Sequence, residues 1–102
     1  MEFGYNSIAA DVLNRNRVKL GAYDFKKEDD PLLIALKKVN ALTRDEIEHI
    51  QSLRTSGGKM SLVIDRLRQR VTRELFLFFA ECVGNIMKMP DLQRKILNEL
   101  DC

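Results

Sequence analysis

Apolar residues recur along much of the chain at spacings of three and four positions, which is the repeat of one face of an α-helix. The clearest case predicts a helix from about Lys59 to Arg70. Its apolar face is made by Met60, Val63, Ile64, Leu67 and Val71. Apolar and polar residues nowhere alternate for long, and no Asn-Gly or Asp-Gly pair indicates a β-hairpin. The pattern therefore predicts an all-helical protein.

Two helices that precede this one have clear starting signals. Asp30 comes directly before Pro31, so the aspartate can accept hydrogen bonds from the first free N–H groups while proline fills the first helical position. This pair predicts the second helix of the chain, which should end near Asn40. Thr43 and Glu46 have the spacing of a capping box, which predicts the start of a third helix.

The first helix is expected to begin at Ser7, a good N-cap residue, and to continue to about Leu20. The apolar spacing is irregular around Asn14 and Asn16, so we expect a bend there. A polar connector over residues 23–29 should join this helix to the second.

Short breakers separate the remaining helices. Residues 55–58, Thr-Ser-Gly-Gly, are expected to break the chain before the fourth helix. A fifth helix should start near Thr72 and a sixth near Pro90, which makes six helices in all. The fifth is the most apolar, so it should occupy the centre of the core, with Leu77 and Phe78 buried on further sides. Its inward-facing residues are expected to be Leu75, Phe76, Phe79, Cys82, Val83 and Ile86.

Length and composition fit one compact domain, since the chain has 102 residues of which 45% are hydrophobic. We therefore predict a single domain over residues 1–102 with a core over about residues 7–100. Its longest apolar run is too short to cross a bilayer, and no leader pattern opens the chain. Cys82 and Cys102 have no CxxC or Cys/His partner, so neither a disulfide framework nor a zinc site is expected. Unpaired thiols are typical of a reducing compartment, so we expect a cytoplasmic location.

No set of residues predicts catalysis or cofactor binding. His49 lies near Asp45 and Glu48, but no nucleophile accompanies it, so a surface histidine is the better interpretation than a general base. Cys82 falls on an apolar helix face, which favours a buried structural cysteine over a reactive one. The pair Gly57-Gly58 lacks the rest of a phosphate loop. We therefore expect no enzyme, no cofactor and no metal.

Charged residues are more segregated than the net charge of +2 suggests. The basic group comprises Arg15, Arg17, Lys19, Arg66, Arg70 and Arg73, of which the last three have the spacing of one helical face. The acidic group comprises Asp29, Asp30, Asp45, Glu46 and Glu48. One interpretation is an ordinary solvated surface, in which acids also favour helix starts. The other is a bipolar module whose basic face contacts the acidic face of another module, and such a contact can propagate into a chain.

Several segments, in the same order along the chain, resemble a caspase recruitment domain (CARD), one of the death-fold families. The run VLNRNRVKL, residues 12–20, resembles the basic first helix of that family. Asp30-Pro31-Leu32-Leu33 with Leu36 resembles the second helix, and residues 41–48, ALTRDEIE, resemble the turn and acidic third helix. Residues 59–67, 76–83 and 92–97 resemble the fourth, the Phe-rich fifth and the sixth helices. The resemblance covers about residues 8–100.

This resemblance implies an all-α, six-helix antiparallel Greek-key bundle, the death fold, with a bent first helix. It implies a homotypic interaction module that recruits CARD-containing caspases, sensors or adaptors in apoptotic or inflammatory signalling. Arg17 falls on the basic first-helix position of the family, and Arg66 and Arg70 lie on the fourth helix. Asp29 or Asp30, with Asp45 and Glu46, fall near the acidic side. On this basis, Arg17→Glu is expected to weaken partner capture without unfolding the domain.

Two alternatives remain open from the residues alone. Cys82 to Ile96 also resembles a death effector domain, a sister family with the same bundle, and Val71-Thr72 stand where a CARD usually has a glycine. A small nucleic-acid-binding helical domain would place Arg66, Arg68, Arg70 and Arg73 on phosphates, and its affinity would fall steeply with salt. We expect a CARD-containing partner or self-association, and neither a membrane nor a nucleic-acid partner.

Overall fold

The computed structural model describes the backbone of residues 2–101 and the side chains of residues 7–100. Cys102 lies outside the described residues. Within residues 2–101 the chain forms helices and no strand, so the prediction of an all-helical protein is confirmed. The helices are α1 (Glu2–Arg15), α2 (Arg17–Leu20), α3 (Pro31–Lys38), α4 (Arg44–Ser52), α5 (Ser56–Arg70), α6 (Arg73–Asn85) and α7 (Pro90–Asp101).

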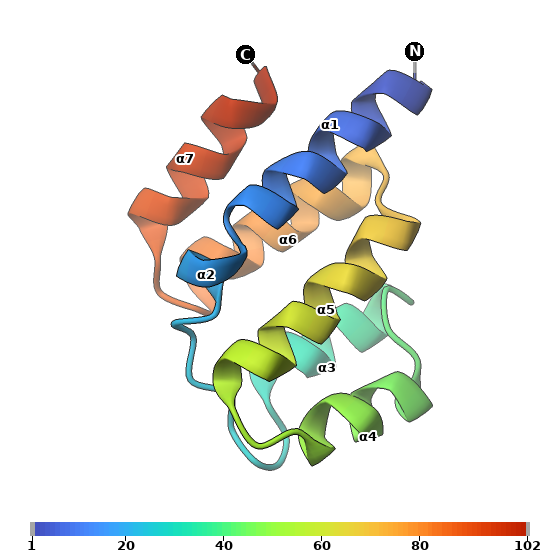
Figure 1. The fold of residues 1–102 in the computed structure, drawn as a ribbon, viewed down its shortest axis with the longest axis vertical. Coiled ribbons are helices and arrows are strands. Elements are labelled where there is room, and N and C mark those ends of the chain that lie inside the picture. Colours follow the sequence, from blue (N-terminus) through green and yellow to red (C-terminus); the bar gives the residue numbers. More distant parts are fainter. Residues whose placement is uncertain (1, 102) are drawn as a thin grey trace.

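The helices form one bundle that measures 37 × 25 × 20 Å (Figure 1). α1 packs against α5, α6 and α7, while α6 packs against α7 and α3. α5 lies between α2 and α4 and contacts both (Figure 1). The start of α1 and the end of α7 lie at the same end of the molecule (Figure 1). This arrangement leaves α2 and the α3–α4 pair on different parts of the surface.

The core is centred on the aromatic residues of α6, as the sequence predicts. Phe76 and Phe79 are fully buried, together with leucines and isoleucines from α1, α3, α5 and α7. The predicted burial of α6 on further sides is wrong for Leu77, which is 41% exposed, whereas Phe78 is half-buried against the core. Leu77 is exposed because the neighbouring helices cover only part of the α6 surface.

The first predicted helix differs from expectation at its start and is broken where a bend was expected. α1 begins at Glu2, so Ser7 lies within it and does not cap it; a helix that continues upstream overrides a single capping preference. The break falls at Asn16, which has φ −99° and ψ 11°. The Asn16 side chain is buried and its Nδ2 donates to the carbonyl oxygen of Val12 at 2.8 Å. The Val12 carbonyl oxygen also accepts from the Asn16 amide at 3.2 Å, so the side chain shares a helical acceptor at the point where α1 ends and α2 begins.

The predicted starts of α3 and α4 are confirmed. Asp30 caps α3 and Pro31 takes its first position. α3 ends before Asn40, which has φ 61°, a left-handed conformation that asparagine tolerates at a helix C-terminus. Thr43 and Glu46 form the capping box of α4 in both directions, side chain to backbone.

The predicted break at residues 55–58 is placed too far along the chain. α5 already begins at Ser56, because the Thr55 hydroxyl accepts a hydrogen bond from the Gly58 amide at 3.0 Å and caps the helix. The glycine pair therefore lies in the first turn of α5. The predicted starts of α6 and α7 are confirmed, with Thr72 capping α6 and Pro90 as the first residue of α7. No helix within the described part of the chain combines the length and apolar character needed to span a membrane.

Candidate interaction surfaces

Glu46, predicted to lie on the acidic face, is bound to two residues predicted to lie on the basic face. The guanidinium of Arg70 forms two short bonds to the carboxylate of Glu46, Nη1 to Oε1 at 2.6 Å and Nη2 to Oε2 at 2.7 Å. Arg66 Nε lies 3.3 Å from Glu46 Oε2. Arg70 Nη1 also donates to the carbonyl oxygen of Ala41 at 2.8 Å. The packing of α4 against α5 therefore joins Glu46, Arg66 and Arg70 within one chain, and their role in partner binding stays a prediction.

This internal ion pair shifts the titration of Glu46. The hydrogen bonds from Arg70, followed in effect by those from Thr43, lower the pKa of Glu46 to about 2 against the opposing effect of burial. The pairing with Glu46 raises the pKa of Arg70. A carboxyl group whose pKa is lower in the folded state stabilises the fold only while it is ionised. Glu46 therefore links the stability of the α4–α5 contact to pH.

We expect the free energy of unfolding to contain a contribution from Glu46 that is complete above pH 4.5 and is lost as the pH falls toward about 2. Glu46→Gln should lower the stability at neutral pH by about 1–2 kcal/mol, a value reduced for the partial exposure of both arginines. The variant should also unfold with a shallower acid dependence than the parent. Urea unfolding at a series of pH values measures both effects.

Glu48→Gln is the matched control, because Glu48 lies on the same helix and is 66% exposed beside Arg44. It should change the free energy of unfolding by less than about 0.5 kcal/mol at every pH. Equal acid profiles for Glu46→Gln and the parent would show that the pair does not couple pH to stability.

Arg17 is also used within the chain. Its Nη2 lies 2.6 Å from Asp65 Oδ1 and 3.1 Å from Asn14 Oδ1. Its Nη1 bonds to the hydroxyl of Ser61, so the side chain joins α2 to α5. Arg17→Glu would place a second carboxylate beside Asp65, so we expect this variant to weaken the α2–α5 contact as well as any partner contact.

Asp30 is wrongly assigned to the acidic face, because it is 1% exposed. Its Oδ1 accepts hydrogen bonds from the amides of Leu32 and Leu33 at 2.9 and 3.2 Å. Its Oδ2 accepts from the amide of Lys26 at 2.9 Å and from the hydroxyl of Tyr23 at 3.0 Å. Burial and the hydrogen bond to Asp30 raise the pKa of Tyr23 above its usual range. Asp30 therefore holds the residue 23–29 connector against α3 and cannot reach a partner.

The other predicted residues remain at the surface. Asp29, Asp45 and Glu48 are exposed on the α3–α4 side of the molecule. Lys19 is exposed on α2, and Arg15 is half-exposed, with Asp11 and Glu99 as its partners. Arg73 is exposed but lies on α6 and not on α5, because α5 ends at Arg70 and Val71 turns the chain. The predicted common face of Arg66, Arg70 and Arg73 therefore does not form on a single helix.

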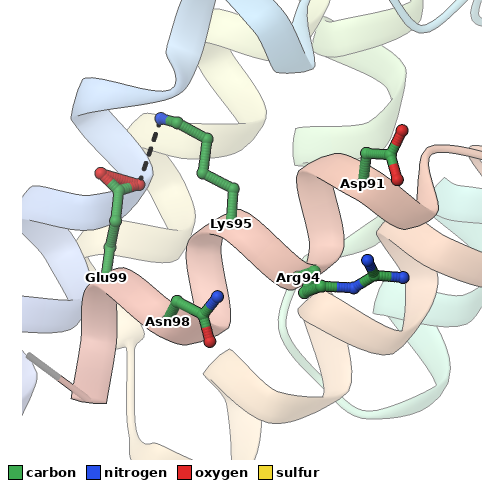
Figure 2. A pocket seen from close by; sticks show the side chains of 5 residues that line it. All are labelled: Asp91, Arg94, Lys95, Asn98 and Glu99. Carbon is green, nitrogen blue, oxygen red and sulfur yellow. Dashed lines mark hydrogen bonds and ion pairs between the residues drawn. The ribbon is translucent and has the colours of Figure 1, made fainter.

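A polar network joins the break in the first helix to α7. Asn16 Nδ2 donates to Glu99 Oε1 at 2.8 Å, and Lys95 Nζ donates to Asn16 Oδ1 at 2.9 Å. Lys95 also lies 3.4 Å from Glu99, as the dashed line in Figure 2 shows. Hydrogen bonding by Asn16 and Lys95 lowers the pKa of Glu99. Asp91, Arg94 and Asn98 lie beside this pair on α7 and point outward around a shallow depression (Figure 2). Lys95 and Glu99 therefore hold α7 to Asn16 and to the end of α1.

Sequence reasoning missed two apolar features of the surface. Val18 on α2 is 88% exposed, the most exposed large hydrophobic side chain among the described residues. Ile34 on α3 is 41% exposed and lines a groove between α3 and α4 with a volume of about 250 Å³. Two features of the sequence could have predicted the exposure of Val18. It falls between Arg17 and Lys19, and it lies outside the apolar stripe of Val12, Leu13 and Leu20.

Cys82 and His49, the two residues considered for catalysis, lie one in the core and one on the surface. Cys82 is buried, and burial raises the pKa of its thiol to about 11, so it is protonated at neutral pH. His49 is exposed on α4 in a shallow groove with Asp45, Leu62 and Arg66. Among the described residues, no three His, Cys, Asp or Glu side chains are grouped as metal ligands. The surface features that remain for function are the exposed charges and the apolar positions on α2 and α3–α4.

Comparisons of this chain with models of protein families, with curated proteins and with solved structures found no match.

Proposed function

We propose that this chain is a death-fold interaction module, closest to a CARD, that binds other modules of its kind in apoptotic or inflammatory signalling. Its fold would then be the six-helix antiparallel Greek-key bundle of that superfamily, with α1 and α2 as the two parts of the first helix. It would act in the cytoplasm by binding and not by catalysis. Partners would be CARD-containing caspases, sensors or adaptors, or a second copy of the chain.

The observation that carries this proposal is the break of the first helix at Asn16. The resemblance implies a bent first helix, and the chain separates α1 from α2 within the segment that carries the resemblance. The break is built in by a buried side chain with three polar partners, the carbonyl oxygen of Val12, Glu99 and Lys95. The break is therefore part of the folded structure and not fraying of a helix end, because a side chain at a frayed end would be exposed to water.

The distribution of exposed charge also supports a homotypic contact, with a smaller set of residues than the sequence suggested. Lys19 on α2 makes no ion pair within the described residues, and Arg15 lies half-exposed at the end of α1. Asp45 and Glu48 are exposed on α4, and Asp29 is exposed just before α3. Opposite charges at separate places on one surface favour encounter with a second module in a fixed orientation. The nucleic-acid alternative is weakened, because Arg66 and Arg70 are already paired with Glu46.

We expect Lys19→Glu to weaken binding to a second copy or to a purified CARD by about tenfold or more, because it places a like charge against the acidic side. Binding is measured by analytical ultracentrifugation for self-association and by calorimetry for CARD partners. Arg94→Glu on α7 is the control, since it makes the same charge change at an exposed position of a different surface. It should leave the affinity unchanged.

Equal affinity for Lys19→Glu and the parent, with native helical circular dichroism, would contradict the proposed surface. The same proteins titrated with duplex DNA and RNA at low salt test the rival class. Binding to nucleic acid that falls steeply with salt, without any binding to a module, would replace the proposal.

A further inference from the structure

We propose that α7 fixes the conformation of α2 through Asn16, so that Lys95 and Glu99 act as positioning residues for the α2 surface. The surface of α2 keeps its shape while α7 holds Asn16, and it loses that shape when the hold is released. The consequence for partner binding rests on the proposed function, whereas the coupling between the two helices can be measured without a partner.

Asn16 is the joint between α1 and α2, because its backbone is bonded to both helices. Its amide donates to the carbonyl oxygen of Val12 at 3.2 Å, and its own carbonyl oxygen accepts from the amide of Leu20 at 2.9 Å. With φ −99° and ψ 11°, the residue departs from regular helical geometry and sets the angle between the two helices. A shift of Asn16 therefore changes the direction of α2 relative to α1.

The side chain of Asn16 is held in place by α7. It is 1% exposed, its Nδ2 donates to Glu99 Oε1 at 2.8 Å, and its Oδ1 accepts from Lys95 Nζ at 2.9 Å. The remaining bond of Nδ2, to the carbonyl oxygen of Val12, lies within the same stretch of chain. Loss of a partner on α7 leaves a polar atom of a buried amide unsatisfied, which is costly enough that we expect the side chain to move.

The short helix α2 has too few residues to be ordered by its own hydrogen bonds. It comprises only Arg17–Leu20, and a single helical turn is unstable in isolation. Its orientation therefore depends on tertiary contacts near its two ends. Arg17 binds Asp65 of α5, and Leu20 is fully buried. Since these two anchors remain when Asn16 is released, α2 should loosen and change direction without leaving the bundle.

The two residues that hold Asn16 are also accessible from outside the molecule. The Lys95 side chain is 45% exposed and that of Glu99 is 23% exposed. They lie one helical turn apart on α7 and line its shallow depression, beside Arg94 and Asn98 (Figure 2). A change at this surface of α7 reaches α2 through direct contacts, because the same two side chains touch solvent and Asn16.

The test compares Glu99→Met with Glu99→Gln, which both remove the charge of Glu99 and keep a similar side-chain length. Glutamine keeps an oxygen that can accept from Asn16 Nδ2, whereas methionine does not. Hydrogen exchange is followed at residues 20–22, whose amides bond to carbonyl oxygens of residues 16–19. These amides should exchange about threefold to tenfold faster in Glu99→Met than in Glu99→Gln, the effect of one hydrogen bond, while the amides of α6 change little.

Where the parent binds a second copy or a purified CARD, Glu99→Met should lower the affinity about fivefold or more relative to Glu99→Gln. In the Lys19→Glu background the two Glu99 variants should bind alike, because α2 no longer contributes to the contact. A merely structural role of Glu99 would lower the affinity equally in both backgrounds. Arg94→Met is the control, because it changes an exposed side chain of the same helix outside the Asn16 network, and it should match the parent in both measurements.

Equal exchange at residues 20–22 in Glu99→Met and Glu99→Gln, with both variants folded by thermal unfolding, would overturn the inference. Faster exchange in Glu99→Met with equal binding, in a parent that binds, would overturn its consequence for the interaction and leave the proposed function standing. If the parent binds no module at any concentration tested, the proposed function fails, and the exchange measurement still decides whether α7 fixes α2.

Discussion

Phe76→Ala should lower the free energy of unfolding by about 3–5 kcal/mol, the largest effect expected for any single substitution considered for this chain. Phe76 lies in α6 and is fully buried, and α6 packs against α1, α3 and α7. Truncation removes its apolar surface from the core and leaves a cavity that the packed helices can only partly fill. Since small domains are stable by only about 5–15 kcal/mol, the variant should be partly unfolded at moderate temperature.

Urea unfolding followed by far-ultraviolet circular dichroism measures this loss. Leu77→Ala is the matched control, because it lies next to Phe76 on the same helix but is 41% exposed. It should cost less than about 1 kcal/mol. Similar losses for the two variants would mean that α6 is not the centre of the core.

Asp30→Ala should lower the free energy of unfolding by about 2–4 kcal/mol, the second largest effect, because it combines loss of an N-cap with the loss of further buried acceptors. The amides of Leu32 and Leu33 lose their cap, and the amide of Lys26 and the hydroxyl of Tyr23 lose their acceptor. The connector before α3 should therefore become mobile. Hydrogen exchange should show that the rate of amide exchange, relative to the parent, rises more at residues 23–33 than elsewhere in the chain.

Two variants separate the contributions of Asp30. Asp30→Asn keeps an oxygen that can cap α3 and should lose less than half as much stability as Asp30→Ala. Asp29→Ala changes the adjacent exposed acid and should cost less than about 1 kcal/mol, a small loss because alanine tolerates the φ of 52° at that position less well than aspartate. A stability loss from Asp29→Ala that equals the loss from Asp30→Ala would show that the structural role has been assigned to the wrong aspartate.

The placement of Asp30 also changes how binding data should be interpreted. If the chain binds other modules as proposed, a substitution there would reduce that binding indirectly, by loosening the connector that carries Asp29 and precedes α3. The same holds for Arg17, which joins α2 to α5. Lys19, Val18 and Ile34 are better probes of the proposed binding, because their side chains are exposed.

The sequence determined most of the helices, because their signals are local. Asp30 with Pro31 and Thr43 with Glu46 act on amide groups two or three residues away, so their effect is readable without the fold. The apolar spacing of α5 and α6 likewise predicts which face is buried. The errors at Ser7 and at Gly57-Gly58 have the same origin, since several weak local preferences compete there and the longer helix prevails.

The packing of the helices against one another sets which charged side chains are paired within the chain and which remain free at the surface. Glu46 lies 20 residues before Arg66 in sequence, and the two meet because α4 packs against α5. Asp30 is removed from the surface by the connector that folds over it, and Val18 is left outside because α2 turns at Asn16. Helix formation depends on neighbours along the chain, whereas the exposure and pairing of a side chain depend on whatever other segment packs beside it. For that reason the pattern of residues predicted the all-helical fold. Several of the residues that it predicted for partner binding instead form contacts within the chain.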